Sequence, residues 1–525
     1  MPTLEIDGKS VTVADGLNLI QAAEQLGIEI PHYCYHPGLT VAGNCRMCLV
    51  EIEKMPKLQI ACNTRVAEGM VVRTQSDRVK HVRASVLEFL LLNHPIDCPI
   101  CDQAGECKLQ DYYMDYDRQA SRVPVEEKVH KGKAIDIGNL VMLDQERCIL
   151  CTRCVRFLDE VTKTSELGVF QRGDHCQIDT FPEKRVDNPY SGNIVDICPV
   201  GALTNKDFRF KARVWYLDHT PSICTRCATG CNIDVHHRRG QVFRYRPREN
   251  DAVNRYWMCD EGRLSYKQLQ GERRLLRAMV RQANQWVATT PDAAIDTVAA
   301  RLRVIRDHHD PHQIGALISA RASNEEVYLF ARLFRDGLRG AQLAGVSWSP
   351  ADAYHDAFLI DGDRNPNTSG VHAFGLGTDA TAVLDAVDAG SIKALVVYRT
   401  DLAALRGEAW LDRVAEQLEF LVVIDTDGHP TAEAADVLLP IATHVETVGT
   451  FTNRQRRVQL ARQALIPPGQ VQEGWLVLSD LGRRVAGWEL HPSAEAVFRE
   501  LSAHTPAFAG LDYGTIGLHG AELGA

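Results

Sequence analysis

Residues 94–107 read His-Pro-Ile-Asp-Cys-Pro-Ile-Cys-Asp-Gln-Ala-Gly-Glu-Cys, with three cysteines in close succession behind a histidine. Three thiolates are one ligand short of a [4Fe–4S] cubane, and the nearest soft donor is His94. An isolated histidine is usually a hydrogen-bonded bystander, but a helical pattern from Val79 to Leu92 delivers this one to the cysteines. A neutral imidazole in place of a thiolate raises the potential of a cluster. The expected ligands, which form the second set along the chain, are His94, Cys98, Cys101 and Cys107.

A first set precedes them, in the pattern C-x10-C-x2-C-x13-C within a β-rich stretch. Leu4–Asp7 and Ser10–Val13 predict a hairpin, Leu17–Leu26 predicts a helix, and Leu49–Ile52 and Val71–Arg73 predict further strands. Three cysteines near one loop and a fourth from a later strand suit a [2Fe–2S] rhomb, with a structural zinc site as the alternative. The expected ligands of the first set are Cys34, Cys45, Cys48 and Cys62.

The third set opens with a crowded C-x2-C-x2-C triplet and closes with Cys198-Pro199. In two-cluster bacterial ferredoxins, a cysteine before proline ligates the cluster of the other half. Counting back from Cys198, the ligands of a twin cluster would fall on Asn188, Ser191 and Ile194, none of which binds iron well. The spacing therefore predicts a single [4Fe–4S] cluster, whose expected ligands are Cys148, Cys151, Cys154 and Cys198.

The fourth set has the spacing C-x2-C-x3-C-x27-C. This pattern favours another [4Fe–4S] cluster, although zinc sites share the C-x2-C element. The expected ligands are Cys224, Cys227, Cys231 and Cys259. Cys176 is left over, far in sequence from every set, and we expect it to be a buried structural thiol.

Composition supports metal ligation over disulfide bonding. All 16 cysteines lie between Cys34 and Cys259, and the remaining 266 residues (525 − 259) contain none. The N-terminus lacks a secretory pattern, so a reducing cytosolic setting is expected, where thiols stay free. The net charge of −10 argues against a nucleic-acid partner, and no apolar run is long enough to span a membrane.

Beyond about Arg274 the chain alternates between short β-branched runs and helical patterns. We expect strands at Ile314–Ser319, Ala394–Tyr398 and Leu421–Asp425, and helices at Ser323–Leu338 and Leu405–Gln417. Ser323 or Asn324 is expected to cap the first of these helices. This alternation predicts parallel α/β layers, and no phosphate-binding glycine motif is present.

These patterns resemble known families. The first two sets resemble segments shared by complex I and iron-only hydrogenases. The fourth set resembles the [4Fe–4S] module of molybdopterin oxidoreductases, with Glu261 where catalytic members carry a lysine, so we expect its carboxylate to repel a pterin phosphate. Further likeness to that family lies in residues 320–326, 435–440 and 449–454.

The four sets in this order resemble the large iron–sulfur subunits of bacterial NADH:quinone oxidoreductase, or complex I, in a form shorter at the C-terminus. The resemblance implies an α+β multi-domain fold. The expected domains are a β-grasp [2Fe–2S] ferredoxin domain (1–78), a His-Cys [4Fe–4S] domain (79–120), a [4Fe–4S] ferredoxin-like domain (139–212), a molybdopterin-oxidoreductase-type [4Fe–4S] module (217–273) and a vestigial α/β region (274–525).

The resemblance also implies a function, namely electron relay from a flavin-bearing, NADH-oxidising partner towards iron–sulfur subunits nearer quinone. It implies one [2Fe–2S] and three [4Fe–4S] clusters, no molybdopterin, no complete active site within the chain, and a peripheral place on the cytoplasmic side of the bacterial inner membrane. The first three clusters are expected on the main path and the fourth off it. An iron–sulfur subunit of a soluble NAD-linked hydrogenase or of a formate dehydrogenase is the alternative; an iron-only hydrogenase and a zinc scaffold are less favoured.

Overall fold

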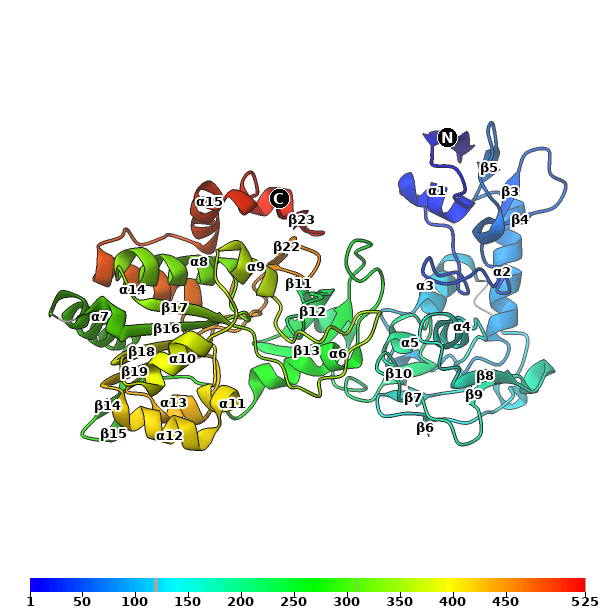
Figure 1. Ribbon diagram of the computed structural model, residues 1–525. Helices are drawn as coiled ribbons and strands as arrows, with labels where there is room; N and C mark the ends of the chain where they lie inside the picture. The colour runs from blue at the N-terminus through cyan, green and yellow to red at the C-terminus, as the bar shows by residue number, and fades with distance from the viewer. Residues whose placement is uncertain (118–120, 309, 525) are drawn as a thin grey trace. The chain divides into compact units, whose positions relative to one another are not determined.

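A computed structural model describes residues 1–117, 121–308 and 310–524. The chain divides into two compact units, Met1–Leu217 and Asp218–Ala525, whose elements are labelled in Figure 1. Within the described residues, no helix combines the length and the apolar character needed to cross a membrane.

The first unit opens with a five-stranded sheet in the order β2-β1-β5-β3-β4. The predicted hairpin, helix and strands are confirmed, because β1 pairs antiparallel with β2 and lies parallel to β5. Asn18 caps the helix α1, where it forms a capping box with Gln21. The elements are β1 (Thr3–Ile6), β2 (Lys9–Thr12), α1 (Leu19–Gln25), β3 (Leu49–Ile52), β4 (Gln59–Ile60) and β5 (Val71–Arg73).

The rest of this unit consists of short elements that connect the cysteine loops. Ser76 caps α2 (Asp77–Leu91), which confirms the helix predicted before His94. A three-stranded sheet has the order β10-β7-β6, and β8 pairs with β9. The remaining elements are α3 (Lys108–Tyr116), β6 (Ile135–Asp136), β7 (Val141–Leu143), α4 (Arg153–Glu160), β8 (Leu167–Phe170), β9 (Gln177–Thr180), α5 (Asn193–Asp196) and β10 (Leu203–Asn205).

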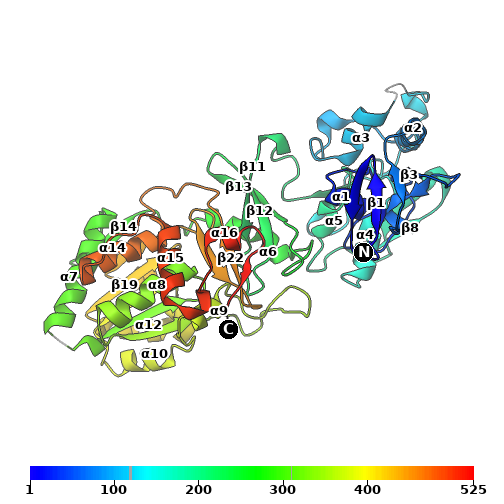
Figure 2. The same cartoon turned by 90° about the horizontal axis from the view of Figure 1, so that it is seen from above.

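The second unit begins with three antiparallel strands that lie side by side (Figures 1 and 2), followed by the short helix α6. The register of this sheet shifts between His236 and His237. The elements are β11 (Asp218–Ile223), β12 (Asn232–Arg238), β13 (Gln241–Pro247) and α6 (Asp260–Leu264).

A seven-stranded sheet in the order β15-β14-β20-β19-β18-β16-β17 forms the centre of the second unit. The five strands from β20 to β17 in this order are parallel, which confirms the predicted α/β layers. The strands are β14 (Ala278–Gln282), β15 (Gln285–Thr289), β16 (Ile314–Ser319), β17 (Gln342–Val346), β18 (Ala394–Tyr398), β19 (Phe420–Asp425) and β20 (Val437–Pro440).

Alternate side chains of each central strand face opposite layers of helices. In β18, Val396 packs into one apolar cluster with α7, α8, α14 and α15, and Val397 packs into another with α10, α11 and α12. Figure 1 shows these helix layers on the two faces of the sheet. The helices are α7 (Pro291–His308), α8 (Asn324–Arg332), α10 (Thr381–Asp388), α11 (Leu402–Arg406), α12 (Glu408–Gln417), α13 (Pro430–Ala434), α14 (Gly474–Ala486) and α15 (Ala494–His504).

A smaller antiparallel sheet, β21-β22-β23, completes the unit. Its strands and the two remaining helices are β21 (Gly449–Thr452), β22 (Arg457–Ala461), β23 (Ala521–Glu522), α9 (Thr368–Ala373) and α16 (Tyr513–Ile516).

Two predicted helices differ from the structure. The helix expected over Leu405–Gln417 is interrupted at Gly407, whose φ of +88° ends α11 before α12 begins. The helix expected over Ser323–Leu338 is α-helical only to Arg332 and continues as a π-helical turn, Leu333–Gly337. Both departures are changes of backbone conformation inside an otherwise helical pattern.

Candidate iron–sulfur cluster sites

The first set is arranged as two pairs of thiols. Cys34 is hydrogen-bonded to Cys45, and Cys48 is hydrogen-bonded to Cys62. The hydrogen bond with Cys45 lowers the pKa of the Cys34 thiol below its usual range. Cys48 lies immediately before β3, and Cys62 lies in the turn that follows β4. Two close pairs of cysteine sulfurs match the two thiolates per iron that a [2Fe–2S] rhomb requires.

The second set lies between two helices. His94 follows α2, Cys98 and Cys101 flank a single 3₁₀ turn, and Cys107 directly precedes α3. The Nδ1 atom of His94 is buried and has no hydrogen-bond partner among the described residues. Burial lowers the pKa of His94 to about 4, so the ring is neutral at physiological pH. An unpartnered buried ring nitrogen that precedes three cysteines in the chain fits an imidazole ligand of a cluster.

The third set surrounds a small cavity. All four of its thiols line this space, together with apolar side chains that include Leu143, Ile178 and Val200. Cys154 lies in the first turn of α4, and Cys198 follows α5. Four thiols around one enclosed apolar space fit a [4Fe–4S] cubane.

The fourth set lies at the ends of β11, β12 and α6, and all four of its cysteines are buried. The Sγ atom of Cys259 accepts a hydrogen bond from the backbone N–H of Gly262 at 3.3 Å. A Cβ atom on Gly262 would lie 2.9 Å from the Sγ of Cys224, so this close approach of backbone to sulfur needs a glycine.

All 16 cysteines lie within the described residues, and none of them forms a disulfide bond. In the described part of the chain, no three His, Cys, Asp or Glu side chains are grouped closely enough to hold a single metal ion. The prediction that Cys176 is buried is wrong, because it lies half-buried after the exposed turn Gly173–His175. Its backbone carbonyl accepts a hydrogen bond from the Nζ of Lys131 at 2.5 Å.

Arginines join the first and third sets, a feature that sequence reasoning missed. The Nη2 of Arg156, on α4, donates to the carbonyl of Cys34 at 2.5 Å and to that of Cys151 at 3.3 Å. Arg153, on the same helix, donates to the carbonyls of Tyr35 and Ile197. The only signal in the sequence is the position of these arginines within and just after the ligand triplet.

A second connection joins the third and second sets. Arg147 forms two hydrogen bonds with the carboxylate of Asp97, from Nε at 3.0 Å and from Nη2 at 2.5 Å. Each residue directly precedes a ligand, Cys148 and Cys98 respectively. A Cβ atom on Gly201 would lie 2.3 Å from the Sγ of Cys101, so the chain after Cys198 passes directly against the second set.

Glu261 forms ion pairs with two arginines. Its carboxylate accepts hydrogen bonds from Arg226 at 2.7 Å and from Arg364 at 2.8 Å. Arg226 lies between two ligands of the fourth set, and Arg364 belongs to the α/β region. The carboxylate therefore ties the fourth set to the α/β region.

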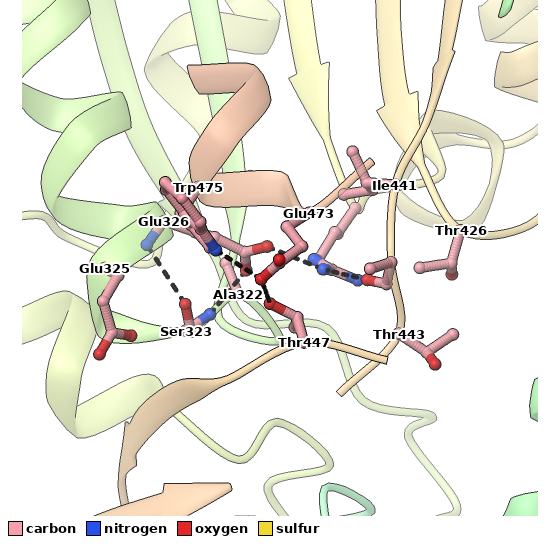
Figure 3. A network of polar contacts seen from close by, with 12 residues as sticks. Ala322, Ser323, Glu325, Glu326, Thr426, Ile441, Thr443, Thr447, Glu473 and Trp475 are labelled. Atoms are coloured by element: carbon pink, nitrogen blue, oxygen red, sulfur yellow. Dashed lines mark hydrogen bonds and ion pairs between the residues drawn. The ribbon is translucent and has the colours of Figure 1, made fainter. Parts of the chain in front are cut away.

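A polar network lies at the start of α8 (Figure 3). Ser323 and Glu326 form a capping box, which confirms Ser323 as the helix cap. Glu326 also pairs with Arg399 at 2.8 Å. Figure 3 shows Glu473 between Thr447 and Trp475, which donate to its carboxylate at 2.5 and 2.7 Å. A cleft beside this network and the fourth set is lined by Arg226, Arg321 and Arg399, and Arg226 and Arg399 pair with carboxylates.

Family models match the chain segment by segment and define its class. The matches are a 2Fe-2S iron–sulfur cluster binding domain (1–77), the NADH-ubiquinone oxidoreductase-G iron–sulfur binding region (83–122), the ferredoxin-like domain of NADH-quinone oxidoreductase subunit 3 (138–204), the molybdopterin oxidoreductase Fe4S4 domain (217–271) and molybdopterin oxidoreductase (349–484). The matches therefore place the predicted iron–sulfur and molybdopterin-oxidoreductase-type modules along the chain in the predicted order.

Curated relatives identify the particular protein that the chain resembles. It is 41% identical over 335 residues to the G subunit of NADH-quinone oxidoreductase from Rickettsia conorii, an alignment that covers 64% of this chain and 49% of that protein. It is 44% identical over 321 residues to the mitochondrial NADH-ubiquinone oxidoreductase 78 kDa subunit of Candida albicans, covering 60% of this chain and 44% of that protein. The chain thus spans about half the length of the curated relatives it matches. The predicted resemblance to the large iron–sulfur subunit of NADH:quinone oxidoreductase is confirmed.

Among solved structures, an NAD+-reducing [NiFe]-hydrogenase in the H2-reduced state matches 41% of this chain and 91% of its own. The identity is 28% and the TM-score is 0.37.

Proposed function

We propose that this chain relays electrons in the peripheral arm of a proton-translocating NADH:quinone oxidoreductase. Its electron donor is a flavin-bearing, NADH-oxidising subunit, and its acceptors are iron–sulfur subunits nearer quinone. The observation that carries the proposal is the linkage of three ligand sets within one compact unit through Arg156, Arg147 and Asp97. As a peripheral subunit, it lies on the cytoplasmic side of a bacterial inner membrane.

The cofactors follow from the four sets. The first set holds a [2Fe–2S] cluster, and the second, third and fourth sets each hold a [4Fe–4S] cluster. These clusters supply one-electron transfer, which the side chains of the protein do not provide. The residues of this chain hold the clusters, exclude water from them and adjust their potentials, so none of them acts as a catalytic acid, base or nucleophile.

Contacts between the ligand loops support the order first, third, second along the electron path. The first and third sets share Arg156, and the third and second sets share the Arg147–Asp97 pair and the contact at Gly201. Electron tunnelling falls steeply with distance, so adjacent loops favour transfer between the sets that they carry. The path therefore differs from the order of the sets in the sequence.

The fourth set stays off this path in our proposal, and the α/β region binds no molybdopterin. Glu261, at the position where catalytic relatives carry a lysine, is engaged by two arginines and is not available to a pterin. A cluster in the fourth set instead completes the core of the β11–β13 module, because ligand binding there contributes folding free energy.

Metal analysis of the anaerobically purified chain tests the proposal. We expect about fourteen irons with matching acid-labile sulfide (2 + 3 × 4), and neither zinc nor molybdenum in stoichiometric amounts. Zinc in place of iron would contradict the relay, and stoichiometric molybdenum or tungsten would contradict the cofactor assignment of the α/β region.

A further inference from the structure

Arg83 is a completely buried cation on α2. Its exposed fraction is 0%, and it is the largest of the fully buried side chains. Its Nη1 lies 3.3 Å from the hydroxyl of Tyr116, and its guanidinium lies 5.1 Å from the centroid of that ring. The Nε and Nη2 atoms have no hydrogen-bond partner among the described residues. Among the described residues, Arg83 thus contacts the hydroxyl and the ring face of one tyrosine, and none of these contacts is with a carboxylate.

Three other arginines with largely enclosed side chains have carboxylate partners. Arg147 pairs with Asp97, Arg274 with Glu446 and Arg399 with Glu326. Arg83 forms no ion pair with any carboxylate in the described part of the chain. An unpaired buried guanidinium costs several kcal/mol, so a buried cation without a visible partner implies an anion nearby.

The position of α2 indicates which anion this is. The helix packs against β3, and β3 begins directly after Cys48. Leu87, one turn after Arg83 on the same face, shares an apolar cluster with Cys34 and Met47. Burial lowers the pKa of Arg83, while the ionisable groups of Tyr116 and Cys48 oppose that effect. The same apolar cluster also contains Cys107 and Cys151. Because α2 packs against β3 and Cys48 is the cysteine whose charge acts on Arg83, the first ligand set is the candidate anion.

A [2Fe–2S] cluster with four thiolate ligands carries a net charge of about −2 when oxidised and about −3 after accepting one electron. We propose that the guanidinium of Arg83 is the buried counter-ion of the cluster held by the first set, and that its charge raises the reduction potential of that cluster. The inference rests on the proposed function for the presence of the cluster. Arg83 lies outside the ferredoxin-type segment, residues 1–78, and tunes the potential of the cluster that this segment holds.

The physical reason is that a fixed cation stabilises the more negative, reduced cluster more than the oxidised one. Water does not reach the side chain of Arg83, which is fully enclosed, so solvent does not screen its charge from the cluster. Low effective dielectric in such a site strengthens the interaction, so loss of a single charge is expected to change the potential measurably.

The test compares Arg83→Met with Arg83→Lys and with Lys80→Met, an exposed cation on the same helix. Potentiometric EPR titration of the [2Fe–2S] signal in the full-length chain should show a lower midpoint in Arg83→Met. We expect at least a tenfold change in the reduction equilibrium, which corresponds to about 59 mV for one electron. Arg83→Lys should restore most of the potential, and Lys80→Met should leave it unchanged. A loaded Arg83→Met chain with the wild-type potential would overturn the inference, as would an equal shift in Lys80→Met.

A second measurement covers a variant that does not retain the cluster. The iron, sulfide and [2Fe–2S] EPR signal of anaerobically purified Arg83→Lys and Arg83→Met are compared. A counter-ion role requires that Arg83→Lys retain the cluster where Arg83→Met loses it. Equal loss in both variants would contradict the inference. A wild-type chain without any [2Fe–2S] signal would contradict the proposed function. This outcome is distinguishable from failure of the inference on Arg83, because it is measured on the unmodified protein.

Discussion

The two units of this chain are stabilised in different ways. In Met1–Leu217, the sheets are short, and an apolar cluster is built partly from ligands, namely Cys34, Cys107 and Cys151. In Asp218–Ala525, a seven-stranded sheet lies between two large apolar clusters that contain no cysteine. The first unit therefore depends on its cofactors for a complete core, and the α/β part of the second depends on ordinary apolar burial.

Polar contacts follow the same division. In the first unit, Arg153 and Arg156 donate to backbone carbonyls of ligand loops. In the second, Arg274 and Arg399 pair with buried carboxylates. Arg153 and Arg156 thus hold ligand loops in place, whereas Arg274 and Arg399 join elements of a sheet-based core.

Removal of all clusters should have the largest effect of these tests, and this effect should differ between the two units. We expect amide hydrogen exchange in residues 1–217 to accelerate by roughly a hundredfold or more, because local protection there requires the ligand loops to be ordered. Exchange in β16, β18 and β19 should remain slow. Equal loss of protection in that sheet would show that the α/β core also depends on metal.

His94→Ala tests one ligand set of the first unit. We expect loss or conversion of one [4Fe–4S] EPR signal and a loss of up to about four irons, with the [2Fe–2S] signal intact. His94→Cys should keep the cluster at a lower potential, because a thiolate replaces a neutral ligand. The control is His81→Ala on the exposed part of α2, which should retain all iron. Full iron and an unchanged spectrum in His94→Ala would show that the ring is no ligand.

Cys259→Ser tests whether the fourth set is structural. We expect lower thermal stability and poorer assembly of the complex, because the β11–β13 module loses its cluster. The NADH–quinone rate per assembled complex should stay close to wild type. A collapse of that normalised rate in a normally assembled complex would place the fourth set on the electron path.

His429 provides a pH-dependent test of the second unit. It lies between Asp401 at 3.4 Å and Asp425 at 3.1 Å, and these carboxylates raise its pKa to about 9 despite burial. The raised pKa contributes about 3 kcal/mol of stability, which is fully present below pH 6.5 and is lost as pH rises through about 9. Thermal unfolding between pH 6 and 10 should show this loss in the wild type. His429→Gln should make the thermal unfolding temperature less dependent on pH. An unchanged pH dependence would exclude the contacts of His429 with Asp401 and Asp425 as its origin.

Cys176→Ser should have the smallest effect. The residue is half-buried and belongs to no ligand set, so iron and sulfide contents should match those of the wild type. Loss of about four irons would mean that one of the four sets is wrongly assigned.

Local patterns could be predicted from the sequence, and long-range pairings could not. The strands Ile314–Ser319 and Ala394–Tyr398 have the predicted bounds, because buried parallel strands are continuous apolar runs. Most ligand cysteines likewise follow short-range spacings, although Cys198 and Cys259 lie 44 and 28 residues after the preceding ligand of their sets (198 − 154 and 259 − 231). The matching family models confirm the modules that contain the four sets.

The pairing of Arg156 with Cys34 spans 122 residues, and that of Arg364 with Glu261 spans 103, so a single sequence gives no sign of either. Arg83 belongs to an ordinary amphipathic helix pattern, and only the tertiary structure reveals that its charge has no carboxylate partner among the described residues.

The hydrogen bonds of Arg156 limit how these segments can be recombined. A transplanted fragment of residues 1–78 would carry its four cysteines into a new host, but the carbonyls of Cys34 and Thr40 would lack the donor that residue 156 supplies. The carboxylate of Glu160, which accepts from the backbone of Thr40, would be missing as well. A transplanted fragment that keeps these hydrogen bonds must therefore include α4. The smallest fragment that does so is larger than one ferredoxin domain.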